Sequence, residues 1–207
     1  MLGRGDWVEL LLPVGNCQRV GAADARVPSL ASRRPLPTLW EHMFVIGIDP
    51  GLSTLGYGLI EARGHNLRAR AAGVIRTDPS AGVGIRLAEL YRDLDALLTE
   101  YQPDNAAIEQ VFVNRNLQTA TSVGRASGVV LLALAQHGIE VAEYSPSAVK
   151  RALSGYGSAD KTQMKKVVAM RLGLKETPGP ADASDALAVA LCHIQSGPVR
   201  RLAEELR

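Results

Sequence analysis

The chain has 207 residues, of which 46% are hydrophobic and 21% are charged. A chain of this length and composition can bury a sizeable core, so we expect one folded domain, with or without an appendage, and exclude a largely disordered protein. The formal net charge is +2. This value neither requires nor excludes a nucleic-acid partner, so a binding surface would have to come from local clustering of charge.

Cysteine usage and hydropathy argue against further classes of protein, namely disulfide-rich, zinc-binding, membrane and secreted proteins. Cys17 and Cys192 are far apart and form no Cys-X-X-Cys or Cys/His pattern, which argues against a disulfide framework and a structural zinc site. The longest apolar run, residues 129–135, is far shorter than the ~18 residues of a membrane span. The apolar patch at 8–14 has acidic neighbours instead of the basic flank of a secretory signal. We therefore expect a cytoplasmic protein with no membrane partner.

Residues 1–42 differ from the rest of the chain. They contain prolines at positions 13, 28, 35 and 37 and show no helical or strand period, which is typical of a disordered extension. Because Met43 directly precedes the first strong strand pattern, we expect it to be the natural start and the preceding segment to be an upstream read-through. The intact mass of the native protein tests this expectation. The predicted organisation is an extension over 1–42, a folded domain over 43–196 and a C-terminal tail over 197–207.

Strand patterns dominate the first part of the domain. A continuous apolar run at 44–48 ends at Asp-Pro-Gly, as expected for a strand buried on both faces and ended by a turn. Two more strand-like runs follow at 56–61 and 70–76. Apolar residues then recur at helical spacing from position 87 to 101, and Pro103 ends that helix.

Helices and strands alternate in the remainder. Strands are predicted at 106–111 and 139–144, with a helix at 117–136 between them. Three helices follow at 146–153, 159–172 and 180–195, and the second opens with Asp160 and Gln163 at capping-box spacing. This order predicts an α/β fold with a mixed sheet and helices on both faces.

Four carboxylates stand at the ends of predicted elements. Asp49 ends the first strand, Glu109 lies near the end of a later strand, and Asp182 and Asp185 open the last helix on one helix face. Each aspartate also has a local interpretation, as a turn former or a residue favoured by the helix dipole. Glu109 resists such an interpretation, because a glutamate in an apolar strand must be paired, exposed at the strand end or bound to a cation.

Convergence of these carboxylates would imply metal chemistry. Clustered carboxylates repel one another unless a cation neutralises them, and several hard oxygen ligands suit Mg²⁺ or Mn²⁺. Two such ions can clamp the attacking and leaving oxygens of a phosphoryl displacement, so the implied reaction is phosphodiester hydrolysis. The sequence contains no P-loop motif and no paired histidine motif.

Basic residues cluster after these acids. Asp160 is the only acid among the residues from 150 to 171, and the basic residues there are Lys150, Arg151, Lys161, Lys165, Lys166 and Arg171. A solvated helix face explains Lys165, Lys166 and Arg171 about as well as phosphate contact does. Lys150 and Lys161 are better candidates, because they bracket a Gly- and Ser-rich loop. Phe112 follows the strand of Glu109 directly and either stacks on an unpaired base or caps the core.

Taken together, the motifs closely resemble the RuvC family of Holliday-junction resolvases, which has the RNase H-like fold. The resemblance covers roughly residues 43–195, and it is carried by four segments: IGIDPG at 46–51, AIEQVF at 107–112, GSADK at 157–161 and ADASDAL at 181–187. It implies a five-stranded mixed sheet flanked by helices on both faces. Residues 1–42 have no counterpart in this pattern.

The resemblance also implies roles for individual residues. The catalytic ligands of two Mg²⁺ ions, which Mn²⁺ could replace, would be Asp49, Glu109, Asp182 and Asp185, and Lys161 would assist catalysis. The residues expected to contact DNA are Phe112, Arg115, Lys150, Lys161 and Lys165. The family acts on four-way junction DNA as a homodimer that nicks opposed strands symmetrically, leaves 5′-phosphate and 3′-hydroxyl ends, and works with RuvA and RuvB.

Other functions remain open at this level. Asp49-Pro50-Gly51 also fits the phosphate-binding strand of an actin-like ATPase, although such proteins pair two RNase H-like halves. A module that binds branched DNA without cutting it, and a related nuclease with another substrate, are further alternatives. Junction cleavage separates all of these from a resolvase.

Overall fold

The structure is a computed structural model. It describes residues 42–110, 117–155, 159–175 and 179–205, with side chains described as far as residue 196. Apart from residue 42, the predicted N-terminal extension therefore lies outside the described residues. No helix in the described part of the chain combines the length and the hydropathy needed to cross a bilayer.

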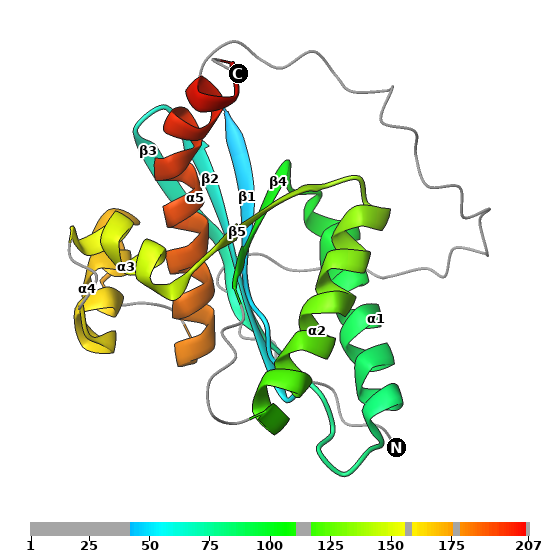
Figure 1. The fold of residues 1–207 in the computed structure, drawn as a ribbon. Helices are drawn as coiled ribbons and strands as arrows, with labels where there is room; N and C mark the ends of the chain where they lie inside the picture. Colours follow the sequence, from blue (N-terminus) through cyan, green and yellow to red (C-terminus); the bar gives the residue numbers. More distant parts are fainter. Residues whose placement is uncertain (1–41, 111–116, 156–158, 176–178, 206–207) are drawn as a thin grey trace.

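Five strands form one mixed sheet, as the resemblance implies (Figure 1). They are β1 (Met43–Asp49), β2 (Thr54–Arg63), β3 (Asn66–Arg76), β4 (Asn105–Glu109) and β5 (Glu140–Tyr144), in the spatial order β3-β2-β1-β4-β5. The pairs β1–β2 and β2–β3 are antiparallel, whereas β1–β4 and β4–β5 are parallel. The C-terminal ends of β1, β4 and β5 consequently meet at one edge of the sheet.

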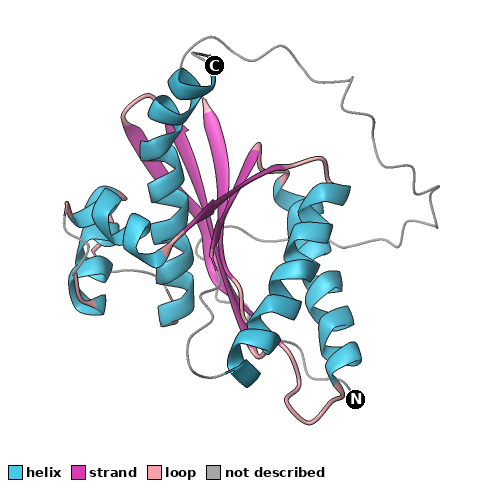
Figure 2. Cartoon of the chain, in the orientation of Figure 1, coloured by secondary structure: helices cyan, strands magenta, loops and turns pink. Residues whose placement is uncertain are grey.

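Helices cover both faces of this sheet (Figure 2). One face carries α1 (Val83–Tyr101) and α2 (Leu117–Gln136), and the other carries α3 (Pro146–Ser154), α4 (Lys161–Arg171) and α5 (Ala181–Glu205). Each face has its own hydrophobic core. In β1, Val45 packs into the core beneath α5, whereas Ile46 and Ile48 pack into the core beneath α1 and α2. Burial on both faces explains why this strand is a continuous apolar run.

Two predicted helix boundaries have clear local causes. Asp160 caps α4 through a capping box with Gln163, as the sequence predicts. The first helix ends at Tyr101, and the next residue, Gln102, adopts a left-handed conformation with φ of 49° before Pro103. A residue before proline disfavours the helical region, so the helix ends there.

The last helix is longer than predicted. The sequence places its end near Gln195, but α5 continues to Glu205. Pro198 lacks a backbone donor and normally disrupts a helix interior. The residues after it include leucine, alanine and two glutamates, which favour helix formation. Helical backbone therefore extends into the predicted C-terminal tail.

Three glycines let α5 lie directly on the sheet. A Cβ atom at Gly47 would stand 2.0 Å from the carbonyl oxygen of Ala186, and one at Gly58 would stand 2.7 Å from the side chain of Leu187. A Cβ atom at Gly56 would stand 2.1 Å from the carbonyl oxygen of Asp182. The missing side chains on β1 and β2 thus set how closely the first turns of α5 approach the sheet.

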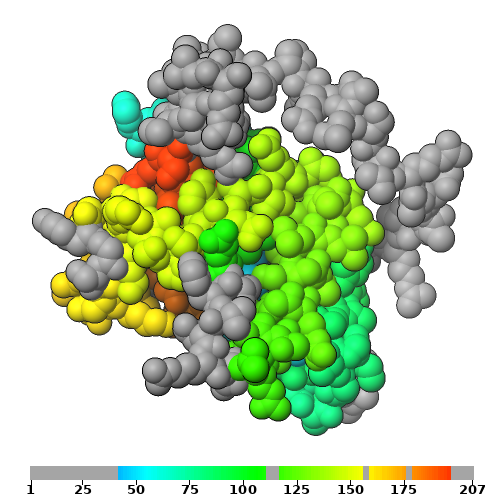
Figure 3. Space-filling view, viewed as in Figure 1, coloured from blue at the N-terminus to red at the C-terminus, as the bar shows by residue number. Residues whose placement is uncertain are grey.

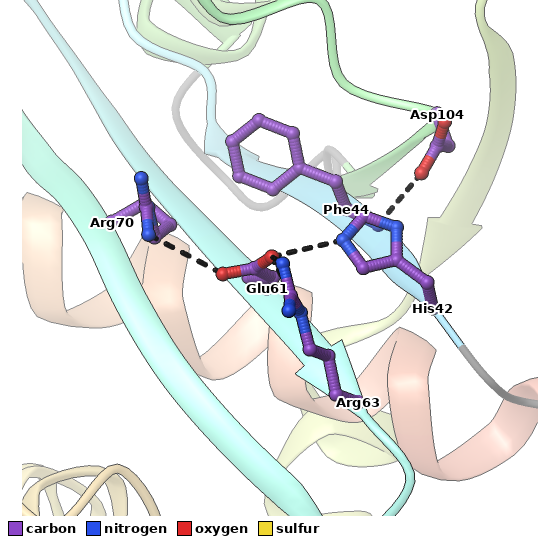
Figure 4. A network of polar contacts seen from close by, with 6 residues as sticks. All are labelled: His42, Phe44, Glu61, Arg63, Arg70 and Asp104. Carbon is purple, nitrogen blue, oxygen red and sulfur yellow. Dashed lines mark hydrogen bonds and ion pairs between the residues drawn. The ribbon is translucent and has the colours of Figure 1, made fainter.

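A polar network lies at the other end of β1 (Figure 4). Glu61 Oε1 is 2.9 Å from His42 Nε2 and accepts hydrogen bonds from Arg63, while Arg70 Nη1 is 3.4 Å from Glu61 Oε2. These contacts, led by the one from His42, lower the pKa of the Glu61 carboxyl. Surface ion pairs of this kind stabilise a protein only weakly.

The same end of the sheet joins β1 to the segment before β4. The backbone N–H of Phe44 donates to the Asp104 carboxylate over 2.9 Å, and the N–H of Asp104 donates to the Phe44 carbonyl over 2.8 Å. Both residues lie beside the start of β1, whereas Asp49 lies at its end. This polar network is therefore remote from the predicted carboxylate site.

Candidate active site

Asp49 and Glu109 lie side by side at the edge where β1 and β4 end. The preceding residues, Ile48 and Ile108, are partners in the parallel register of these strands and pack into the core beneath α1 and α2. Since successive side chains alternate between the two faces of a strand, Asp49 and Glu109 fall on the opposite face. That face is the one covered by α5.

The first turns of α5 bring the other two carboxylates to the same place. Asp182 and Asp185 are both partly buried, whereas the intervening Ala183 is fully buried in the core against the sheet. Gly56 is the register partner of Asp49 and lies directly under the backbone of Asp182. The pairing of β1 with β2 and the contact of α5 with Gly56 thus place Asp182 beside Asp49.

The electrostatics of Asp49 report this proximity. Its pKa is raised from 3.8 to about 7, first by burial and then by the negative charges of Glu109, Asp185 and Asp182, while Lys161 opposes the shift. The other three predicted carboxylates therefore all lie close enough to act on Asp49. A carboxyl that keeps its proton close to neutral pH is poised to exchange that proton for a cation.

Glu109 is perturbed in the same direction. Burial and the charge of Asp185 raise its pKa, and a hydrogen bond with Asp49 opposes the rise, together with the charges of Lys161 and Lys150. Two carboxyl groups share a hydrogen bond only when one of them is protonated. The raised pKa of Asp49 makes it the donor and Glu109 the acceptor.

Two predicted basic residues lie next to the carboxylates. Lys161, the first residue of α4, places Nζ 3.6 Å from Asp185 Oδ2, with its side chain 81% exposed and that of Asp185 29% exposed. Lys150 on α3 lies close enough to lower the pKa of Glu109. Lys165 lies one helical turn after Lys161 and is partly buried. Figure 3 shows α3 and α4 (yellow and orange) on one side of the molecule and α2 (green) on the other.

Two predicted DNA-binding residues cannot be placed. Phe112 and Arg115 lie outside the described residues, between the end of β4 and the start of α2. Their roles remain predictions from the sequence.

The donor set suits divalent cations. Four carboxylates with one exposed lysine at their edge offer hard oxygen ligands and excess negative charge, which is the chemistry that Mg²⁺ and Mn²⁺ require. Within the described ranges, no three Asp, Glu, His or Cys side chains are grouped tightly enough to enclose an ion. The fit therefore rests on ligand chemistry and on the mutual repulsion of the carboxylates.

Sequence analysis alone does not identify the glycines against which α5 packs. Gly47 and Gly56 pack against backbone atoms of that helix, so they set the approach of Asp182 and Asp185 to the strand ends. Glycine is unfavourable in a strand interior and often marks close approach of another backbone. The sequence signal for this close packing is the presence of three glycines in β1 and β2, two of them at alternate positions of β2.

Comparisons with known proteins identify the family. The sequence model described as Crossover junction endodeoxyribonuclease RuvC matches residues 45–193. A relative of that name from Chloroflexus aggregans is 49% identical over 156 residues, covering 75% of this chain and 95% of that protein. Another of that name, from Heliobacterium modesticaldum, is 48% identical over 150 residues, covering 72% of this chain and 93% of that protein.

A solved structure matches as well. RuvC of T. thermophilus in complex with a Holliday junction substrate superimposes with a TM-score of 0.73 at 36% identity, covering 77% of this chain and 97% of that one. The resemblance found in the sequence is thereby confirmed, as is the fold it implies. The chain belongs to the RuvC family of crossover junction endodeoxyribonucleases.

Proposed function

We propose that this chain is a metal-dependent endonuclease that resolves four-way (Holliday) DNA junctions in recombination and repair. The convergence of Asp49, Glu109, Asp182 and Asp185 at one edge of the sheet, in a member of the RuvC family, carries the proposal. The relatives are named crossover junction endodeoxyribonucleases, and the T. thermophilus protein is described with a junction substrate. RuvC proteins are metal-dependent nucleases.

Two Mg²⁺ ions are the proposed cofactors, with Mn²⁺ able to replace them. Asp49, Glu109, Asp182 and Asp185 would hold them. When bound, the ions would neutralise the clustered carboxylates, activate water and stabilise the negative charge that develops on the scissile phosphate.

The residues around this site have their own tasks. The reaction joins a water oxygen to phosphorus and breaks the bond from phosphorus to the 3′ oxygen, which leaves with a proton, so the ends are a 5′-phosphate and a 3′-hydroxyl. Asp49 and Glu109 would give up the proton they share when they hold the cations. Lys161 extends into solvent from the edge of the site, where its ammonium can meet the scissile phosphate and balance the charge of Asp185.

DNA contacts extend outward from this centre. Lys150, Lys161 and Lys165 are proposed to contact the DNA backbone on the α3–α4 side, and Arg115 is proposed to contact DNA as well. Phosphate contacts of this kind position the nucleic acid without reading its sequence. Phe112 is proposed to stack on or wedge between bases that are unpaired at the junction centre.

Symmetric resolution requires two such sites. We propose that the chain acts in the cytoplasm as a homodimer whose two sites nick opposed strands, and that it works with RuvA and RuvB. Gly124 and Gly128 of α2 have open space above them, since a Cβ atom at either would meet nothing within 4 Å. Such a surface allows close contact with another helix.

A cleavage assay tests the proposal. Purified protein, Mg²⁺ and a mobile synthetic four-way junction are incubated beside plain duplex, and nicks are mapped on every strand. We expect symmetric nicks in opposed strands of the junction, none in the duplex, and loss of cleavage but not of binding in Asp185→Asn. Binding without cleavage would instead identify a recruiting module, and cleavage of duplex alone would leave a nuclease that is not a resolvase.

A further inference from the structure

Arg86 ties three elements together at the edge of the site. It lies in the first turn of α1, where its Nε donates to Thr77 Oγ1 over 3.0 Å and its Nη2 donates to Ser53 Oγ over 2.7 Å. Thr77 directly follows β3, and Ser53 belongs to the turn between β1 and β2. One guanidinium therefore bridges two loops that are 24 residues apart in the chain.

The Thr77 hydroxyl links Arg86 to the backbone of Leu52. Its side chain is buried, with the residue only 6% exposed, and Oγ1 donates to the Leu52 carbonyl over 2.7 Å. The Thr77 N–H also points to the Ser53 carbonyl, at 3.4 Å. Arg86 and Thr77 thus hold both Leu52 and Ser53. A planar guanidinium suits this task, because its donors have fixed directions.

The turn held in this way adjoins the carboxylates. It spans residues 50–53 and begins directly after Asp49, and its Leu52 side chain is buried in the core beneath α1 and α2. A Cβ atom at Gly51 would stand 2.2 Å from the Thr54 carbonyl oxygen, so the turn is tight. Lys150 and Lys161 lie on the α5 face of the sheet, whereas Leu52 of this turn packs on the face covered by α1 and α2. DNA that contacts both lysines and the turn would therefore lie over the ends of the strands.

We propose that Arg86 is a positioning residue for DNA cleavage, which holds the turn after Asp49 in the geometry that meets the scissile strand. This proposal rests on the proposed nuclease function. Ladder hydrogen bonds fix Asp49 up to its pairing with Gly56, but the turn beyond it relies on contacts with other elements. A displacement of about 1 Å near reacting groups can lower a rate on the order of 100-fold.

Three variants separate positioning from a direct phosphate contact. Arg86→Lys keeps the positive charge but loses the planar fork that reaches both hydroxyls. Thr77→Val keeps the shape of the side chain at position 77 and leaves Arg86 with its charge. It removes the hydroxyl that bonds both Arg86 and Leu52. Arg86→Gln removes the charge. Arg92→Gln is the matched control, because Arg92 is an exposed arginine of the same helix that bonds its neighbour Asp93.

The decisive measurement is the single-turnover cleavage rate of a four-way junction prebound by saturating protein. Affinity, its salt dependence and the thermal midpoint are measured on the same samples, at a temperature where every variant is folded. We expect Arg86→Lys, Arg86→Gln and Thr77→Val each to slow cleavage by at least about tenfold. Their Kd should stay within about threefold of the wild type, and Arg92→Gln should match the wild type.

Each alternative outcome contradicts the proposal in its own way. If only Arg86→Gln is impaired, and the salt slope of binding falls by about one unit, Arg86 contacts a phosphate directly. If the midpoints fall while folded variants cleave at the wild-type rate, the network serves stability alone. If the wild type and Arg92→Gln do not cleave the junction, the proposed function fails, and the positioning role fails with it.

Discussion

Gly56 lies directly against the backbone of Asp182, and a Cβ atom at Gly56 would come within 2.1 Å of the Asp182 carbonyl oxygen. The clash would be with backbone, which cannot rotate away as a side chain can. Gly56 is also the register partner of Asp49. A single hydrogen atom in place of a methyl group therefore sets the distance between the strand and the helix that carry the proposed metal ligands.

Gly56→Ala is expected to abolish most cleavage. The added methyl group must push the first turn of α5 off the sheet, which moves Asp182 and Asp185 away from Asp49, and forced packing of this kind typically costs about 1–3 kcal/mol. Junction cleavage and thermal unfolding are measured together. Gly84→Ala is the matched control, because a Cβ atom at Gly84 in α1 meets nothing within 4 Å. Full activity of a folded Gly56→Ala variant would contradict the assigned packing role.

Asp49→Asn is expected to stabilise the metal-free protein near neutral pH. Folding raises the pKa of Asp49 from 3.8 to about 7, so between these values the folded state binds more protons than the unfolded state, and stability falls as the pH rises. One pKa unit corresponds to about 1.4 kcal/mol, so the loss is at most on the order of 4 kcal/mol. It is complete above about pH 7 and absent below about pH 4.

Urea unfolding of the wild type and Asp49→Asn in the presence of a chelator measures this difference. The gap between the two free energies of unfolding should widen as the pH rises from about 4 to about 7 and then stay constant. Asp104→Asn is a suitable control, since Asp104 contacts Phe44 beside the start of β1, at the end remote from Asp49. A gap that does not change with pH would contradict the raised pKa.

Much of this fold was predictable, because its elements have strong local causes. The apolar run of β1, the boundaries of α2 and the capping box of Asp160 all follow from local sequence. The length of α5 was not predicted, since Pro198 signals a helix end that the residues after it override. Local sequence cannot weigh such opposing preferences.

The members of the candidate carboxylate site can be proposed from the sequence, but the contacts that support the site cannot. Asp49 and Glu109 end apolar strands, and this pattern is visible without a structure. By contrast, Arg86 is six residues before Arg92 in the same helix, and nothing in the sequence distinguishes the two. Only tertiary contacts with Ser53 and Thr77 show that Arg86 adjoins the site.

Replacing Lys161 with alanine is expected to weaken junction binding and to make that binding less dependent on salt, because one phosphate contact is lost. The side chain is 81% exposed, so its loss should leave the thermal midpoint nearly unchanged. Each lost phosphate contact makes the negative slope of log K against log salt shallower by about 0.9. Binding isotherms at several salt concentrations give this slope. Lys175→Ala, at an exposed position after α4, is the control. An unchanged slope for Lys161→Ala would argue against a phosphate contact.

Metal binding is expected to release protons, and the release should depend on Asp49. At a pH just below about 7 a large share of Asp49 carboxyl groups carry the proton that is donated to Glu109, and a cation must displace it. Titration calorimetry with Mn²⁺ in two buffers of different ionisation enthalpy gives the number of protons released. We expect this number to fall as the pH rises from about 6 to about 8, because Asp49 is then already ionised. Asp49→Asn should bind Mn²⁺ more weakly and release fewer protons at the lower pH, and equal release by the two proteins would show that the displaced proton comes from elsewhere.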